Sequence, residues 1–174
     1  MTTKRIIYTR PDGGVSIIVP APSFIAGLMA EGKTEDEAVA IVHGKDVPAD
    51  AVNPQTVEAA SLPSDREFRN AWEKPGANIT ISLAKAKTTA QRFIAALVRQ
   101  EIGFLQDRRT QAEIENDGTL VGQIDARLSD IQTNVVPQIR DGIIAASTVD
   151  VLKSVRQNYL DGRPQAVMDA LGDG

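Results

Sequence analysis

The stretch SLAKAKTTAQRFIAALVRQEIGFLQDRRTQAEIE, residues 82–115, contains no proline and a single glycine, Gly103. Its apolar side chains recur every three or four residues, at Leu83, Ala86, Ala90, Phe93, Ile94, Leu97, Val98, Ile102, Leu105 and Ala112. This spacing predicts one long amphipathic helix, with Ser82 as its N-cap. At a rise of about 1.5 Å per residue, the helix would be roughly 50 Å long, whereas a compact domain of this size is about 30 Å across.

A second amphipathic helix is predicted to fold back along the first. The segment 116–118, Asn-Asp-Gly, breaks the long helix, and Thr119 is the predicted N-cap of the next one. Apolar residues then follow at helical spacing: Leu120, Ile124, Leu128, Ile131 and Val135. Pro137 is expected to interrupt this helix, which would be about 25 Å long, half the length of the first. The two helices together predict an antiparallel hairpin.

This expected difference in length leaves part of the apolar stripe of the long helix without a partner in the same chain. An uncovered apolar stripe favours association, and its three–four spacing suits packing against another helix. We therefore predict a protein interface, with a second copy or with another protein, at Phe93, Ile94, Leu97, Val98, Ile102 and Leu105. The alternative is that these side chains form the core of this chain.

Shorter helices are predicted after the hairpin. One begins at Pro137 and runs to about Ala146, and Ser147 or Thr148 caps a last one. The last helix would turn four side chains inward: Val151, Leu152, Val155 and Tyr159. Residues 161–174 are rich in glycine and aspartate and are expected to fray.

The N-terminal part of the chain has the pattern of a small ββαβ module. The runs KRIIYTR (4–10) and VSIIV (15–19) flank a proline–aspartate–glycine turn, which is typical of a β-hairpin. A short apolar segment, 23–30, predicts one or two helical turns, and QTVEA (55–59) predicts a third strand.

Two capping boxes indicate further helices in this module. Thr34 and Glu37 begin a helix that Gly44 is expected to end. Ser64 and Glu67 form the second box and predict a short helix. On that helix, two aromatic side chains four residues apart are expected to be buried together against the sheet: Phe68 and Trp72.

These patterns predict an α+β chain with two parts. Residues 1–76 would form the small α+β module, with its ββαβ order. Residues 77–174 would form a helical arm, built from the long-helix hairpin and the short C-terminal helices.

Composition excludes several classes of site. The chain has no cysteine, so disulfides and thiolate metal ligands are impossible. Its net charge is -4, and 8 basic and 11 acidic side chains in residues 1–78 are followed by 11 and 12 in residues 79–174. This even distribution argues against binding of nucleic acid. Since no apolar run approaches about 18 residues, a membrane span is not expected either.

The segment GLMAEGKT, residues 27–34, matches the pattern of a phosphate-binding P-loop. In a P-loop, Lys33 would reach the β- and γ-phosphates and Thr34 would bind magnesium. The context argues against this function, because Pro20 and Pro22 separate the segment from the preceding strand and no acidic magnesium partner follows. We expect a glycine-bounded turn that leads into the next helix, with no nucleotide or other cofactor.

Other polar residues do not combine into a catalytic or metal site. His43 is the only histidine, and no partners for a triad or a zinc site are visible. Asp65, Glu67 and Glu73 are explained by helix capping and by solvation. We therefore predict no catalytic residue and no metal ligand.

Four stretches of the N-terminal part resemble a family of small proteins encoded among the structural genes of tailed bacteriophages and prophages. They are IIYT with DGGVSI and PAP (6–22), TEDEA (34–38), KDVPA (45–49) and LPSDREFRNAW (62–72). The resemblance covers roughly residues 5–75, and the helical half resembles the family more loosely. It implies a virion component or an assembly factor, and it carries no catalytic residues.

We therefore expect a non-enzymatic structural protein of a bacteriophage virion, at the tail, the tail fibres or the baseplate. It would bind other virion proteins and copies of itself, and no nucleic acid, membrane or small-molecule substrate. It would be found in the virion and, before assembly, in the host cytoplasm. The alternative is a tail-fibre assembly chaperone that is absent from the finished particle, and a weaker alternative is a P-loop nucleotide-binding protein.

Overall fold

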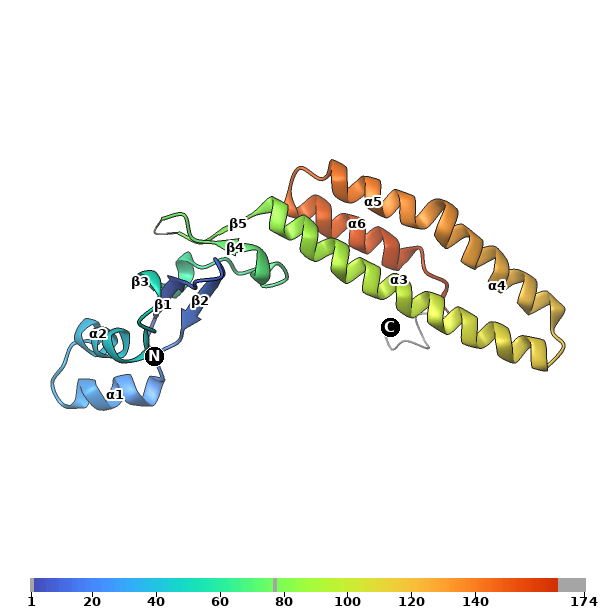
Figure 1. Ribbon diagram of the computed structural model, residues 1–174. Helices are drawn as coiled ribbons and strands as arrows, with labels where there is room; N and C mark the ends of the chain where they lie inside the picture. Colours follow the sequence, from blue (N-terminus) through green and yellow to red (C-terminus); the bar gives the residue numbers. More distant parts are fainter. Residues whose placement is uncertain (1, 77, 166–174) are drawn as a thin grey trace. The chain divides into compact units, whose positions relative to one another are not determined.

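The computed structural model describes residues 2–76 and 78–165 and has an α+β fold (Figure 1). The chain forms two compact units, Met1–Lys85 and Ala86–Gly174, which we call the N-terminal unit and the helical unit. The predicted boundary after residue 76 thus lies a short distance before the division between the units. Fraying was predicted for residues 161–174. Residues 166–174 lie outside the described residues, but the prediction is wrong for residues 161–165, because α6 extends to Asp161 and Arg163 is only 5% exposed.

A three-stranded antiparallel sheet forms the centre of the N-terminal unit. Its strands β1 (Lys4–Thr9), β2 (Val15–Ile18) and β3 (Val52–Glu58) have the order β2-β1-β3. The predicted hairpin is confirmed: Arg10 N–H donates to the carbonyl of Gly14 at 2.7 Å, and Gly13 has φ +77°, which favours glycine. Strand β3 is longer than predicted and includes Pro54, which an edge strand tolerates.

Two helices follow the hairpin, α1 (Pro22–Ala30) and α2 (Glu35–Asp46). The capping box that begins α2 is confirmed, because Glu37 N–H donates to Thr34 Oγ1 and Thr34 N–H donates to Glu37 Oε2. The prediction that Gly44 ends this helix is wrong. The helix continues to Asp46, and Val47 takes an extended conformation because Pro48 disfavours a helical residue before it.

The sheet has a separate apolar cluster on each face. Ile6 packs with Ile25 and with residues of α2, whereas its neighbour Ile7 packs with Trp72 and Ile79. Successive residues of a strand point to opposite faces, so one hairpin strand contributes to both clusters.

Trp72 is buried against the sheet as predicted, but the helix expected to carry it is absent. The Glu67 N–H donates to Asp65 Oδ1 at 2.9 Å, so an Asp-centred turn replaces the Ser64–Glu67 capping box. A single 3₁₀ turn, η2 (Arg69–Ala71), then leads into β4 (Trp72–Glu73), which pairs with β5 (Thr80–Ile81). Phe68 is also buried, with 3% of its surface exposed.

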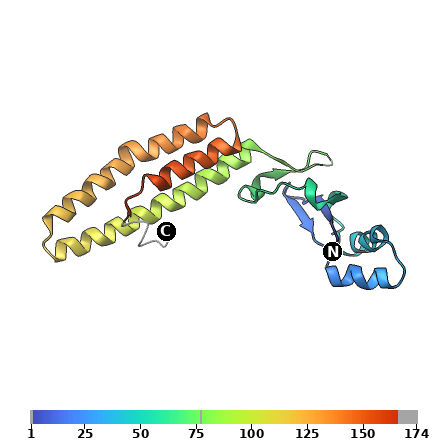
Figure 2. The same cartoon turned by 180° about the vertical axis from the view of Figure 1, so that it is seen from behind.

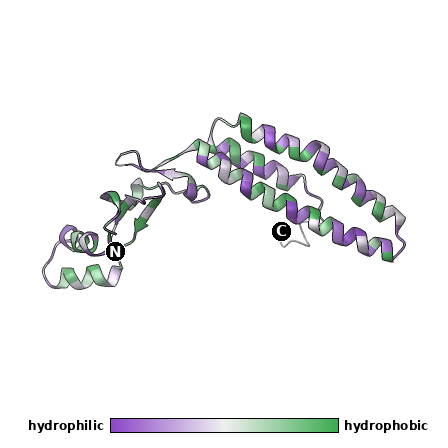
Figure 3. Cartoon of the chain, viewed as in Figure 1, coloured by the Kyte–Doolittle hydropathy of each residue, from purple (hydrophilic) through white to green (hydrophobic). Residues whose placement is uncertain are grey.

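The helical unit contains the long helix α3 (Leu83–Ile114), which begins within the last residues of the N-terminal unit and confirms the prediction for residues 82–115. It is followed by α4 (Gly118–Asp130), the π-helical turn η3 (Ile131–Val135), α5 (Val136–Ala145) and α6 (Val149–Asp161). In both views, α6 and the α4–α5 run lie alongside α3 (Figures 1 and 2). Apolar and polar residues alternate around these helices (Figure 3).

Two details of the helical hairpin differ from the prediction. Asp117, not Thr119, caps α4, and its Oδ1 accepts from Leu120 N–H at 2.9 Å. Pro137 does not interrupt the return helix, which remains helical through η3 into α5. A wider π turn before Pro137 accommodates the ring and the missing N–H donor. The return helix therefore runs along most of α3, and the expectation that it is half as long is wrong.

Candidate functional site in the helical unit

A buried carboxylate lies in the middle of α3. The Glu101 side chain is 0% exposed, although a charged residue is seldom fully buried without partners. Glu101 is not among the six residues predicted as an interface, but its position in the helical repeat indicates that it is buried. Glu101 continues the spacing of Ala90, Ile94 and Val98, which are also buried on α3, so it belongs to the inward face of the helix.

Three side chains from other parts of the unit surround this carboxylate, and together with it they form what we call the Glu101 cluster. Arg127 on α4 donates from Nε to Glu101 Oε1 at 2.9 Å, and its Nη2 lies 2.8 Å from the same oxygen without the geometry of a hydrogen bond. Tyr159 on α6 donates its hydroxyl to Oε2 at 2.8 Å, and Arg163 Nε lies 3.7 Å from Oε2. The cluster therefore connects α3, α4 and α6.

The chemistry of the Glu101 cluster is that of a structural link. Burial, together with the hydrogen bond to Glu101, raises the pKa of Tyr159 well above its ordinary value, so its hydroxyl stays protonated and donates at neutral pH. Arg127 also reaches Asp130, with Nη1 2.9 Å from Oδ2. Each carboxylate oxygen of Glu101 thus faces a donor, which offsets the cost of its burial.

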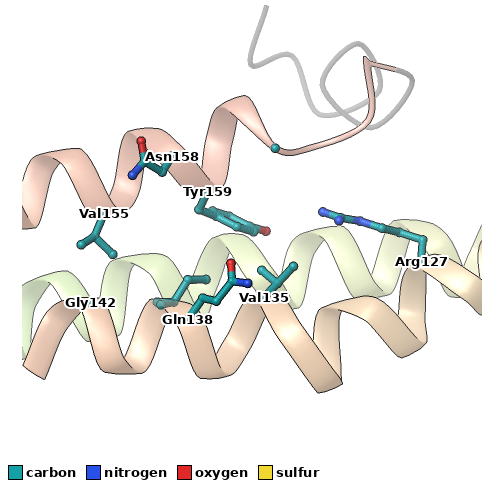
Figure 4. Close-up of a pocket in the computed structure, with 9 residues that line it drawn as sticks. Arg127, Val135, Gln138, Gly142, Val155, Asn158 and Tyr159 are labelled. Atoms are coloured by element: carbon teal, nitrogen blue, oxygen red, sulfur yellow. The ribbon is translucent and has the colours of Figure 1, made fainter.

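A cavity of about 270 Å³ lies beside the Glu101 cluster, between α4–α5 and α6. It is lined by Arg127, Val135, Gln138, Ile139, Gly142, Val155, Asn158, Tyr159 and Gly162. Figure 4 shows the polar ends of Arg127 and Tyr159 directed toward each other at one end of the cavity. Arg127 and Tyr159 are the titratable residues of the described lining. Both donate hydrogen bonds, so this lining offers no general base.

A second hollow, which we call the α3–α5 groove, is apolar. It has a volume of about 320 Å³ and is lined by Gln91, Ile94, Ala95, Val98 and Arg99 of α3 and by Val136, Ile139, Arg140 and Ile143 of α5. Near one end of α3, Lys87 donates from Nζ to the carbonyl of Ile144 at 2.7 Å. This bond connects α3 to the last turn of α5, close to the groove.

The six residues predicted as an interface do not share one surface. Ile94 and Val98 line the α3–α5 groove, where they are 1% and 8% exposed. Leu105 is buried, and Leu97 and Ile102 are half-buried. Phe93 is 49% exposed, and the guanidinium of Arg156 on α6 lies 5.7 Å from its ring centroid. The return helix is not half as long as α3, so the reason given for this interface is wrong. The interface itself stays a prediction.

The P-loop-like segment has a helical setting. Gly27 lies within α1, and the residues after it remain helical to Ala30. Thr34 is engaged in the capping box of α2, where its hydroxyl meets Glu37 Oε2 at 3.0 Å. His43 lies on α2, half-buried, beside a hollow that Lys4 and Asp36 also line.

We expect no specific binding of ATP or GTP to this segment, and no difference between the wild type and Lys33→Ala. The reason is that α1 and the capping box already use the backbone and the hydroxyl that a P-loop offers to phosphates and magnesium. Isothermal titration calorimetry with magnesium nucleotides measures this directly. Submillimolar affinity that Lys33→Ala abolishes would contradict the expectation.

Within residues 2–76 and 78–165, no three His, Asp or Glu side chains gather in a way that could hold a metal ion. None of the helices in that part of the chain is long and apolar enough to cross a membrane. Comparison of the chain with protein-family models, with curated proteins and with solved structures found no match.

Proposed function

We propose that the protein is a non-enzymatic structural component of a bacteriophage virion, associated with the tail or its fibres, and that it acts through protein–protein contacts of its helical unit. The observation that carries the proposal is the α3–α5 groove, a hollow of about 320 Å³ lined mainly by apolar side chains. The resemblance of residues 5–75 to proteins from phage structural genes supplies the biological setting.

Exposed apolar side chains near the groove support a role in protein binding. Val136, which lines it, is 43% exposed, and Ile144, at the end of the same helix pair, is 63% exposed. Apolar surface that gathers at one hollow is typical of a docking site for another protein. The main partners of the Glu101 carboxylate, in contrast, lie within the unit, so we assign the Glu101 cluster to stability.

The test is mass spectrometry of purified particles of the phage that encodes the chain. We expect the protein in particles that have been washed and banded, at a constant ratio to the major tail proteins. A tail-fibre assembly chaperone would instead be found in the infected cell and be missing from the particles, and that result would contradict the proposal.

A variant of the groove tests which surface is used. Val136→Glu places a charge in the apolar lining and is expected to reduce incorporation into particles at least about tenfold, because the charge would be desolvated on docking. The prediction that Val151 faces inward is wrong, because this side chain is 41% exposed on α6. Val151→Glu is therefore the matched control, since Val151 does not line the groove. Circular dichroism on both purified variants shows whether the helices are intact. Equal incorporation of the two variants would contradict a role of the groove.

A further inference from the structure

The residues that line the α3–α5 groove recur on each helix with a spacing that suits packing against a third helix. On α3 the lining residues are 91, 94, 95, 98 and 99, and on α5 they are 136, 139, 140 and 143. Each set is one helix face with a three–four repeat. A third helix laid between two such faces packs its own ridge into both, as in a helix bundle.

An extended peptide fits this groove less well than a helix does. The walls are helices, whose backbone N–H and C=O groups are bonded within each helix and cannot pair with an added strand. A strand lying here would therefore leave its own polar groups unpaired beside apolar side chains such as Ile139 and Ile143, which is costly.

The charged side chains of the groove indicate which side chains a partner helix would carry. Two arginines, Arg99 and Arg140, are among its described lining residues, and no carboxylate is. Arg140 Nε lies 2.9 Å from Asp141 Oδ1, but this pair is largely exposed, and its free energy is small. A guanidinium has five N–H donors, so Arg140 can bind a partner carboxylate as well. Both rim charges thus favour acidic side chains on whatever docks.

From this combination we infer that the α3–α5 groove receives an amphipathic helix of another virion protein, with acidic side chains beside its apolar stripe. The inference rests on the proposed function and names the chemistry of the partner. A second copy that docked the same face against this one would bring Arg99 and Arg140 toward the arginines of its partner, because such an interface is self-complementary. Like charges at an interface oppose association.

Two synthetic peptides test the inference on the full-length chain. Both are helical and carry leucine at positions i, i+3, i+4 and i+7, and they differ only in flanking glutamates or flanking lysines. Fluorescence anisotropy with labelled peptides is expected to give a Kd for the acidic peptide at least about tenfold lower than for the basic one, with the difference shrinking as salt is added. Equal Kd values, or no binding of either peptide, would overturn the inference.

Charge reversal of the rim provides the matched variants. The double variant Arg99→Glu with Arg140→Glu is expected to reverse the preference, so that the basic peptide binds more tightly. Arg108→Glu is the control, because Arg108 lies on α3 and is exposed but does not line the groove. An unchanged preference in the double variant, or an equal change in the control, would also overturn the inference.

The outcomes separate this inference from the proposed function. If sedimentation velocity shows a dimer of the wild type that Val136→Glu disrupts and that excludes both peptides, then a second copy occupies the groove and the inference is wrong. If the protein is present in particles and the peptides show no charge preference, only the inference fails. If the acidic peptide binds selectively and the particles lack the protein, the proposed virion role fails while the chemistry of the groove stands.

Discussion

Replacement of Glu101 by alanine is expected to lower the free energy of unfolding by about 3–5 kcal/mol. The substitution removes the carboxylate that faces the fully buried guanidinium of Arg163 and the mostly buried guanidinium of Arg127, which keeps its contact with Asp130. Removal of one partner from a buried ion pair costs more than the pair itself contributes, because the remaining charge is desolvated. Urea unfolding followed by circular dichroism, which reports mainly on helix, measures the change.

Two further variants separate charge from shape in the Glu101 cluster. Glu101→Gln keeps the volume and removes the charge, so we expect a loss close to that of alanine. Tyr159→Phe removes only the hydroxyl that donates to Oε2, and the expected loss is about 1.5–3 kcal/mol, the range for a hydrogen bond to a charged group. A change of less than about 1 kcal/mol for Glu101→Ala would contradict the assignment of this cluster to stability.

Trp72→Ala is expected to destabilise the N-terminal unit by about 3–5 kcal/mol. The Trp72 side chain is 1% exposed and packs with Ile7, Val15 and Ile79 on one face of the sheet. Since it is the only tryptophan, its native emission reports on this cluster alone, and a blue-shifted maximum is expected. A solvent-like emission maximum in the native protein would show that the ring is not in the core.

Trp72→Phe is the conservative control. The indole N–H is buried and has no hydrogen-bond partner among the described residues, so phenylalanine loses ring volume but no hydrogen bond. We expect a loss clearly smaller than that of alanine. An equal loss for the two variants would mean that ring packing is not what stabilises this position.

The parts of the fold that could be predicted from the sequence depend on signals close together in the chain. The hairpin turn contains Gly13, which can adopt the positive φ that the turn requires. The capping box of α2 needs only Thr34 and Glu37. The long helix was predictable because its apolar repeat continues without a break. The failed Ser64–Glu67 box shows the limit of such signals, because the nearer Asp65 carboxylate competed for the Glu67 N–H.

The inward position of Glu101 could be predicted from its helical spacing, but its partners could not, because they lie far away in the sequence. The partner of the Glu101 hydrogen bond at Tyr159 is 58 residues away, and no local pattern fixes that pairing. The groove is lined by α3 and α5, and α5 begins directly after the π turn η3. A proline in the sequence predicts that the helix is interrupted there. Whether the helix instead continues past the proline depends on how it packs against its neighbours, which the local sequence does not show.

Site-specific photo-crosslinking during phage assembly tests the proposal that the α3–α5 groove binds another virion protein. A photoreactive amino acid at Ala95, which is exposed and lines the groove, is compared with the same amino acid at Gln100, which is exposed on α3 outside it. We expect purified particles to contain a crosslink from position 95 to a different virion protein, and none of comparable yield from position 100. Crosslinks from position 95 that lead only to a second copy of this chain, or are no more frequent than those from position 100, would contradict it.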